Sequence, residues 1–162
     1  MILFPPALQA PAPQAPAPAA PLPFASVKAQ YKWSFRGATE SGSGSLTLAL
    51  DPATGKLVLE VFTYGDRLAL VDGDTAGGYQ LVLPKEKVNR TVPSLADLPL
   101  PFLPQAGSVE ALARALALGE GEGLSVEKRD AQGPVKLRYA GQDEAGKAVE
   151  VRLTRKRWEP AK

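Results

Sequence analysis

The feature that most constrains this chain is a two-residue alternation of apolar and polar side chains that begins at Val27. Ala29, Tyr31, Trp33 and Phe35 fall on one side of the alternation, and polar or charged residues separate them. Successive side chains of a β-strand point to opposite faces, so this period indicates a long strand with one buried and one solvated face. Such a strand needs a sheet to continue it and an apolar layer to cover it.

The same alternation recurs between turn residues along most of the chain. Further strands are expected at residues 46–50, 57–61, 68–70, 79–83, 88–92, 124–126, 135–139 and 149–153. Turn signals such as those of residues 51–55 and 141–146 separate them at a spacing of roughly ten residues, as in an up-and-down antiparallel meander. Parallel strands would instead need a helix between each pair.

Residues 93–119 depart from this pattern and predict a loop followed by one helix. Four prolines interrupt the apolar residues of 92–104, which is typical of a loop. Ser108 is expected to cap a helix that runs to about Leu118 and ends at Gly119, with Leu112 and Leu116 on one apolar face. A short amphipathic helix of this kind needs an apolar surface to cover.

These patterns together predict a mainly β fold. We expect a curved antiparallel meander that forms an incomplete barrel of about nine strands, because a long antiparallel sheet tends to curl. The loop–helix insertion at 93–119 is the segment available to cover the concave side as a lid. Residues 27–159 are thereby assigned to a single domain.

Residues 1–26 form a distinct leader without charged side chains. Half of the sixteen prolines lie at or before Pro23, which favours an extended, disordered tether rather than part of a packed core. The first ten residues are similar to the end of a secretory signal, but they lack its basic start. An uncharged tail and the remnant of an export signal both fit, and the second predicts a periplasmic or other extracytoplasmic location.

Composition excludes several classes of function. The 162 residues include 19 basic and 17 acidic ones, a balance too close to neutral for a nucleic-acid-binding protein. Cysteine and histidine are absent, which removes thiolate nucleophiles, the usual zinc sites and the commonest proton-transfer group. Asp72 and Asp74 lack the further oxygen ligands of a calcium loop. We therefore expect no enzymatic activity, no metal and no cofactor.

Three segments carry a resemblance to a known family. The segments 33–37 (WSFRG), 44–48 (GSLTL) and 64–70 (YGDRLAL), with a helical insertion after the middle strands, resemble the LolA/LolB-like superfamily of lipoprotein carriers and lipid-binding proteins. The likeness spans residues 27–158. It implies an apolar concave face under a helical lid, a location in the cell envelope, and transport of lipids or of the acyl chains of lipoproteins.

The candidate site is the apolar face of the sheet and the lid that covers it. The residues expected to contact a hydrophobic ligand are Tyr31, Trp33, Phe35, Leu48, Leu59, Leu81, Leu100, Phe102, Leu112 and Leu116. Burying an acyl chain contributes about 0.8 kcal/mol per methylene and needs no reactive group. The alternative is an envelope interaction module whose interior is packed shut and which binds a protein partner through an edge or loop.

A second contact is expected near the C-terminus. Arg155, Lys156 and Arg157 precede Trp158, and a basic run beside an interfacial aromatic residue is able to touch anionic lipid headgroups weakly. A solvated final strand is the other interpretation of the same run.

Overall fold

The computed structural model describes residues 21–63, 65–97, 107–142 and 145–161. Its strands are β1 (Ser26–Arg36), β2 (Ser41–Asp51), β3 (Lys56–Thr63), β4 (Asp66–Asp74), β5 (Gly78–Leu83), β6 (Val88–Val92), β7 (Leu124–Asp130), β8 (Gly133–Gln142) and β9 (Ala148–Ala161). A 3-10 helix, η2 (Leu95–Asp97), and an α-helix, α1 (Val109–Leu118), lie between β6 and β7. The predicted nine-stranded, mainly β fold with one short helix is confirmed.

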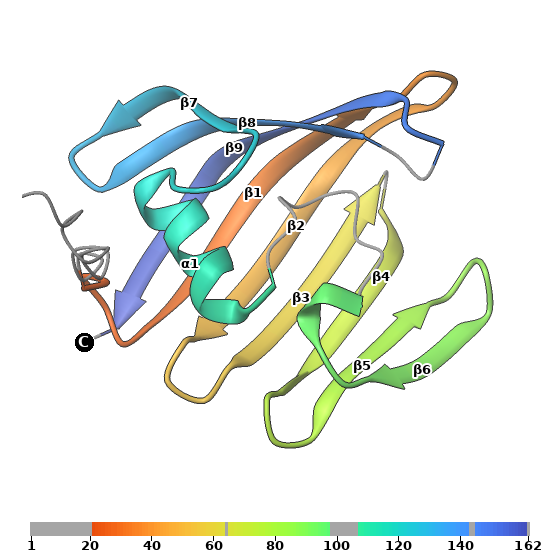
Figure 1. The fold of residues 1–162 in the computed structure, drawn as a ribbon, viewed down its shortest axis with the longest axis horizontal. Helices are drawn as coiled ribbons and strands as arrows, with labels where there is room; N and C mark the ends of the chain where they lie inside the picture. The colour runs from red at the N-terminus through yellow and green to blue at the C-terminus, as the bar shows by residue number, and fades with distance from the viewer. Residues whose placement is uncertain (1–20, 64, 98–106, 143–144, 162) are drawn as a thin grey trace, which may run out of the picture.

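All nine strands belong to one open antiparallel sheet. Its order is β6-β5-β4-β3-β2-β1-β9-β8-β7, so the first six strands form a meander and β9 returns to pair with β1. The connection from β6 to β7 must therefore pass from one edge of the sheet to the other. Figure 1 shows α1 lying across one side of the curved sheet. We call the side that α1 covers the inner face and the opposite side the outer face.

The strand register brings the apolar residues together on the inner face. Leu81, Val71, Leu59, Leu48 and Ala29 are direct cross-strand neighbours on five adjacent strands. All five are buried. Directly opposed side chains on one face are the pairs that stabilise a sheet, at about 0.2–1 kcal/mol each. The period-two alternation in the sequence thus becomes a continuous apolar surface.

The helix α1 has the ends that the sequence predicts. The Ser108 hydroxyl accepts a hydrogen bond from the backbone N–H of Ala111 at 3.1 Å, and Gly119 adopts the left-handed conformation with φ 75°. These caps satisfy backbone groups that the helix itself leaves unpaired. Leu112 and Leu116 are buried with the sheet residues in one core. In the part of the chain that the structure describes, no helix is long and apolar enough to cross a membrane.

The packed region begins slightly before the first predicted strand. Phe24 is buried and meets Trp158 edge to face, with ring centroids 5.7 Å apart. The backbone N–H of Ala25 donates to the carbonyl of Ala161 at 2.8 Å. The last residues assigned to the leader therefore pack against the end of β9, whereas residues 1–20 lie outside the described part of the chain.

Gly44 allows the indole of Trp33 to lock β2 against β3. The indole N–H lies 3.1 Å from the Ser45 carbonyl and 3.2 Å from the Phe62 carbonyl. A Cβ atom on Gly44 would stand 1.9 Å from the Phe62 carbonyl oxygen and 3.0 Å from the indole ring. Only a residue without a side chain permits this approach.

Gly44→Ala should lower the free energy of unfolding by about 1–3 kcal/mol, because backbone and indole must shift to admit the methyl group. Urea unfolding measures the change. Gly107→Ala is the matched control, since a Cβ atom there meets no atom within 4 Å. Equal stabilities of the two variants would contradict the role assigned to Gly44.

Candidate functional site

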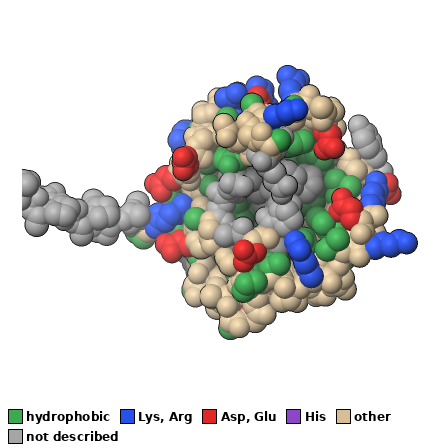
Figure 2. Space-filling view, turned by 45° about the vertical axis from the view of Figure 1, so that its right-hand side comes forward, with side chains coloured by type: hydrophobic (Ala, Val, Ile, Leu, Met, Phe, Trp, Pro, Cys, Tyr) green, Lys and Arg blue, Asp and Glu red, His purple; other side chains and the backbone are tan. Residues whose placement is uncertain are grey.

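The structure brings the predicted strand and helix residues together in one core. Tyr31, Trp33, Leu48, Leu59 and Leu81 on the sheet, with Leu112 and Leu116 on α1, are each exposed by 4% or less. Phe35 is half-buried against the same core. The two remaining predicted residues, Leu100 and Phe102, lie outside the described residues. Figure 2 shows hydrophobic side chains gathered around a hollow, with charged side chains near its margin.

The seven buried residues are packed rather than open to solvent. A side chain that lines a water-filled cavity keeps accessible surface, but Tyr31, Leu59 and Leu81 have none. The structure therefore represents a closed state at these positions. A ligand reaches them only by replacing side chains that now cover the inner face.

Apolar contacts hold α1 against the sheet. The helix lies against β2 and β8, and its buried side chains include Val109, Leu112 and Leu116. Arg114 forms ion pairs with Glu110 and Glu120, which flank it in the chain. Apolar contacts are non-directional, so the hydrocarbon chain of a ligand is able to substitute for the apolar contacts of α1.

Trp33 has a structural role that the alternation alone does not reveal. Its ring packs over Gly42 and Gly44. Its indole N–H already donates to backbone carbonyls of β2 and β3. The two glycines of the segment 42–44 are the sequence signal for this arrangement, because they face the aromatic strand across the sheet. Trp33 therefore fixes the end of the β2–β3 pairing instead of offering a free surface to a ligand.

Arg155 belongs to the inner face, although the sequence places it in an exposed basic run. Arg155 continues the alternation of Val151 and Leu153 and lies directly opposite Tyr31, before the bulge that shifts the register at Lys156. The Arg155 side chain is only 7% exposed. Its guanidinium pairs with the Asp130 carboxylate, donates to the Pro134 carbonyl at 3.1 Å, and lies 5.9 Å from the Trp158 ring centroid. The alternation of Val151 and Leu153 is the sequence signal for this placement, because Arg155 is the next residue on the same face.

The predicted basic cluster is thereby divided between the two faces. Arg155 points inward and is ion-paired, whereas Lys156 is exposed at the bulge. Arg157 is exposed and lies 3.8 Å from the Glu159 carboxylate. Arg155, Lys156 and Arg157 therefore do not share one cationic surface, because Arg155 lies on the same face as Val151 and Leu153. Contact of this run with anionic headgroups stays a prediction that concerns Lys156 and Arg157.

Tyr31 carries a buried phenol with a strongly altered acidity. Burial raises the pKa of Tyr31 far above its ordinary value, since a phenolate there would lose its hydration, and the positive charge of Arg155 opposes this effect only in part. Among the described residues, the hydroxyl has no hydrogen-bond partner. Burial thus favours the protonated phenol of Tyr31 in the folded chain.

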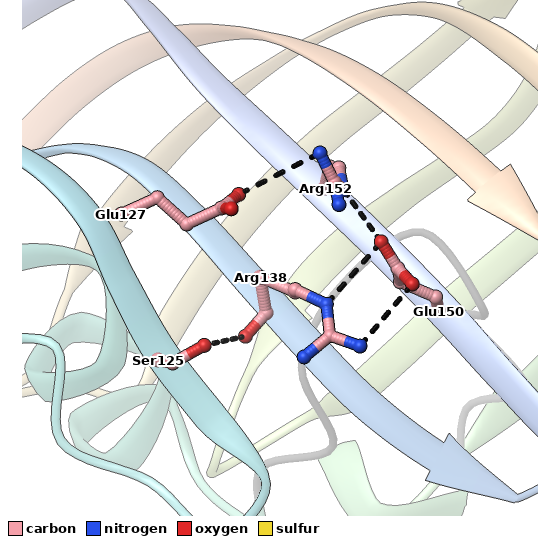
Figure 3. A network of polar contacts seen from close by, with 5 residues as sticks. All are labelled: Ser125, Glu127, Arg138, Glu150 and Arg152. Atoms are coloured by element: carbon pink, nitrogen blue, oxygen red, sulfur yellow. Dashed lines mark hydrogen bonds and ion pairs between the residues drawn. The ribbon is translucent and has the colours of Figure 1, made fainter.

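The outer face carries a polar network around Glu150 (Figure 3). Its carboxylate pairs with the guanidinium groups of Arg138, at 3.3 Å, and of Arg152. Arg152 also lies 4.0 Å from Glu127, and the Ser125 hydroxyl donates to the Arg138 carbonyl at 3.4 Å. Hydrogen bonds from Arg152 and then Arg138 hold the pKa of Glu150 below its usual value. These exposed pairs join β7, β8 and β9 and contribute little stability.

A shallow groove lies beside this network. It has a volume of about 290 Å³. Its lining combines charged and hydroxyl residues, namely Lys32, Ser34, Glu127, Lys136, Arg152 and Thr154, with the apolar residues Trp33, Leu137 and Leu153. Charged and hydroxyl groups on an open surface do not suit a purely apolar ligand. The inner face therefore remains the candidate site for such a ligand.

Neither a family model nor a curated protein matches the sequence. Within the described residues, no group of three or more carboxylate, thiol or imidazole side chains is placed to hold a metal ion. The assignment of the site therefore depends on the geometry of the inner face and on the chemistry of the residues that line it.

Alkaline pH should reveal the buried phenol. Above about pH 10 the unfolded chain loses the Tyr31 proton while the native chain keeps it, so the free energy of unfolding falls as the pH rises. The contribution of one group is at most about 1.4 kcal/mol per pH unit. Tyr31→Phe should show a correspondingly shallower fall in urea unfolding between pH 8 and about 11. Identical slopes in the two proteins would mean that the phenol ionises freely.

Proposed function

We propose that this protein is a non-enzymatic carrier that binds a hydrophobic ligand against the inner face beneath α1. The observation that carries the proposal is the construction of that face: apolar residues from adjacent strands form one continuous surface, and a ten-residue helix covers part of it through apolar side chains. A ligand with an acyl chain would take the place of α1 on this surface. Binding would then be coupled to displacement of the lid.

Binding of a ligand would exchange the contacts of α1 on the inner face for those of the ligand. The closed state already buries the inner face, so a ligand gains only the difference between its own contacts and those of α1. Each methylene contributes about 0.8 kcal/mol, and a long chain offers many of them. When the ligand displaces α1, the helix loses the apolar contacts of its leucine and valine side chains with the sheet. Because the contacts of the ligand replace those of α1, the ligand is able both to bind and to leave, as a carrier requires.

The resemblance to LolA/LolB-like carriers supports the same proposal and extends it to a location. Under this proposal the ligand is a lipid or the acyl chain of a lipoprotein, and the protein works in the periplasm or another extracytoplasmic compartment. Cell fractionation of the protein expressed with its own leader tests the location. Recovery only with cytoplasmic markers would contradict it.

A closed interaction module is the second candidate function, and the near-complete burial of the inner-face residues favours it. Its binding surface would be a strand edge. The edge strands are β6, which has five residues, and β7, whose pairing with β8 contains two register shifts. Short or irregular edges pair poorly with another strand. This weakens the module relative to the carrier.

Displacement of a fluorescent fatty-acid probe distinguishes the two candidates. The carrier should bind the probe saturably at micromolar protein, and an unlabelled lipid should compete for the same site. Probe fluorescence during titration measures both steps. An absence of saturable binding would exclude the carrier and leave the module.

Leu112→Ala tests whether α1 competes with the ligand. The substitution weakens the packing of the lid on the sheet, and the affinity for the probe should rise by about tenfold for every 1.4 kcal/mol of that weakening. Val71→Ala is the control, because Val71 is equally buried but lies on β4, away from β2 and β8. It should lower stability without raising affinity. Equal affinities of Leu112→Ala and the parent protein would contradict the lid mechanism.

A further inference from the structure

The described part of the inner face contains one polar atom that the packing leaves unsatisfied. The Tyr31 hydroxyl lies near the middle of the sheet, on the strand that joins the β2 side to the β9 side, and the residue has no exposed surface. No described residue forms a hydrogen bond with it. Buried hydroxyl groups are nearly always paired, because an unmade hydrogen bond costs free energy. The exception at Tyr31 therefore calls for a partner.

Tyr79 shows what the same side chain does elsewhere on this face. It is also buried, but its hydroxyl donates to the Gly55 carbonyl at 2.5 Å. The residues that the structure describes thus supply an acceptor for the phenol of Tyr79 and none for that of Tyr31. The difference is specific to the position of Tyr31.

The surroundings of Tyr31 indicate the charge of the missing partner. Arg155 is its direct cross-strand neighbour and is nearly buried. A guanidinium has five N–H donors, and its contacts with Asp130 and Pro134 use two of them. Asp130 is 46% exposed and pairs with one side of the guanidinium, so three N–H donors of Arg155 have no partner among the described residues. The inner face therefore places the Tyr31 hydroxyl, which is a hydrogen-bond donor, beside the positive charge of Arg155.

We propose that this place receives the carboxylate of the bound ligand, which makes the ligand a carboxylic acid with a long hydrocarbon chain. The inference rests on the carrier function proposed above and narrows its ligand class. The carboxylate accepts a hydrogen bond from the Tyr31 hydroxyl and lies within the field of Arg155, while the hydrocarbon chain occupies the apolar surface. Hydrogen bonds to an ionised acceptor are the stronger kind, and the low dielectric of the core strengthens them further. A neutral ester lacks the charge that Arg155 would favour.

Competition between dodecanoate and its methyl ester for the fluorescent probe tests the inference at neutral pH. The two ligands share the hydrocarbon chain and differ in the charge of the head. The parent protein should bind dodecanoate about tenfold or more tightly than the ester. Tyr31→Phe should remove most of this preference by weakening acid binding, with ester binding unchanged. It should still fold, because it deletes an unsatisfied hydroxyl and keeps the ring.

Tyr79→Phe is the matched control. It removes the other buried inner-face hydroxyl together with its bond to Gly55, so it should lower stability and leave the preference for the acid intact. Equal binding of acid and ester by the parent protein, or an unchanged preference in Tyr31→Phe, would overturn the carboxylate site while leaving the carrier function standing. Failure of both ligands to displace the probe would overturn the carrier function as well.

Discussion

The structure depends on the burial of one face of an open sheet. Nine strands in antiparallel order present a continuous apolar surface, and an open sheet cannot cover that surface by closing on itself. The cover comes from the connection between the two edge strands, which has to cross the sheet in any case. Topology and hydrophobic burial thus place α1 on the inner face together. Under the proposed function this cover is exchangeable, because α1 meets the sheet through apolar side chains.

The regular parts of this fold could be predicted from the sequence because they depend on local patterns. The period of two indicated the strands other than β6, and Ser108 with Gly119 indicated both ends of α1, since strand alternation and helix caps involve residues a few positions apart. The concentration of Leu48, Leu59 and Leu81 on one buried face follows from the same alternation. Pairing in register then needs only that each strand turn its apolar side inward.

The parts that escaped prediction depend on contacts between distant residues. The bulge at Lys156, which brings Trp158 opposite Ala29, arises where β9 pairs with β1, more than a hundred residues away in the chain, and no local pattern near Lys156 indicates it. The indole of Trp33 finds its acceptors on two neighbouring strands, so the alternation shows that it is buried but not that its N–H is engaged. The unpaired hydroxyl of Tyr31 is likewise visible only when all its neighbours are in place.

The measurement that most directly tests the central claim is mass spectrometry of the lipids retained by the purified protein. If a hydrophobic ligand displaces α1 from the inner face, organic extraction should release molecules with acyl chains. Their molar amount should be comparable to that of the protein. Tyr31 and Arg155 lead us to expect that these molecules are carboxylic acids. A protein purified under mild conditions that carries no lipid, and that takes up none when mixed with a lipid extract, would show that the inner face is a permanently closed core.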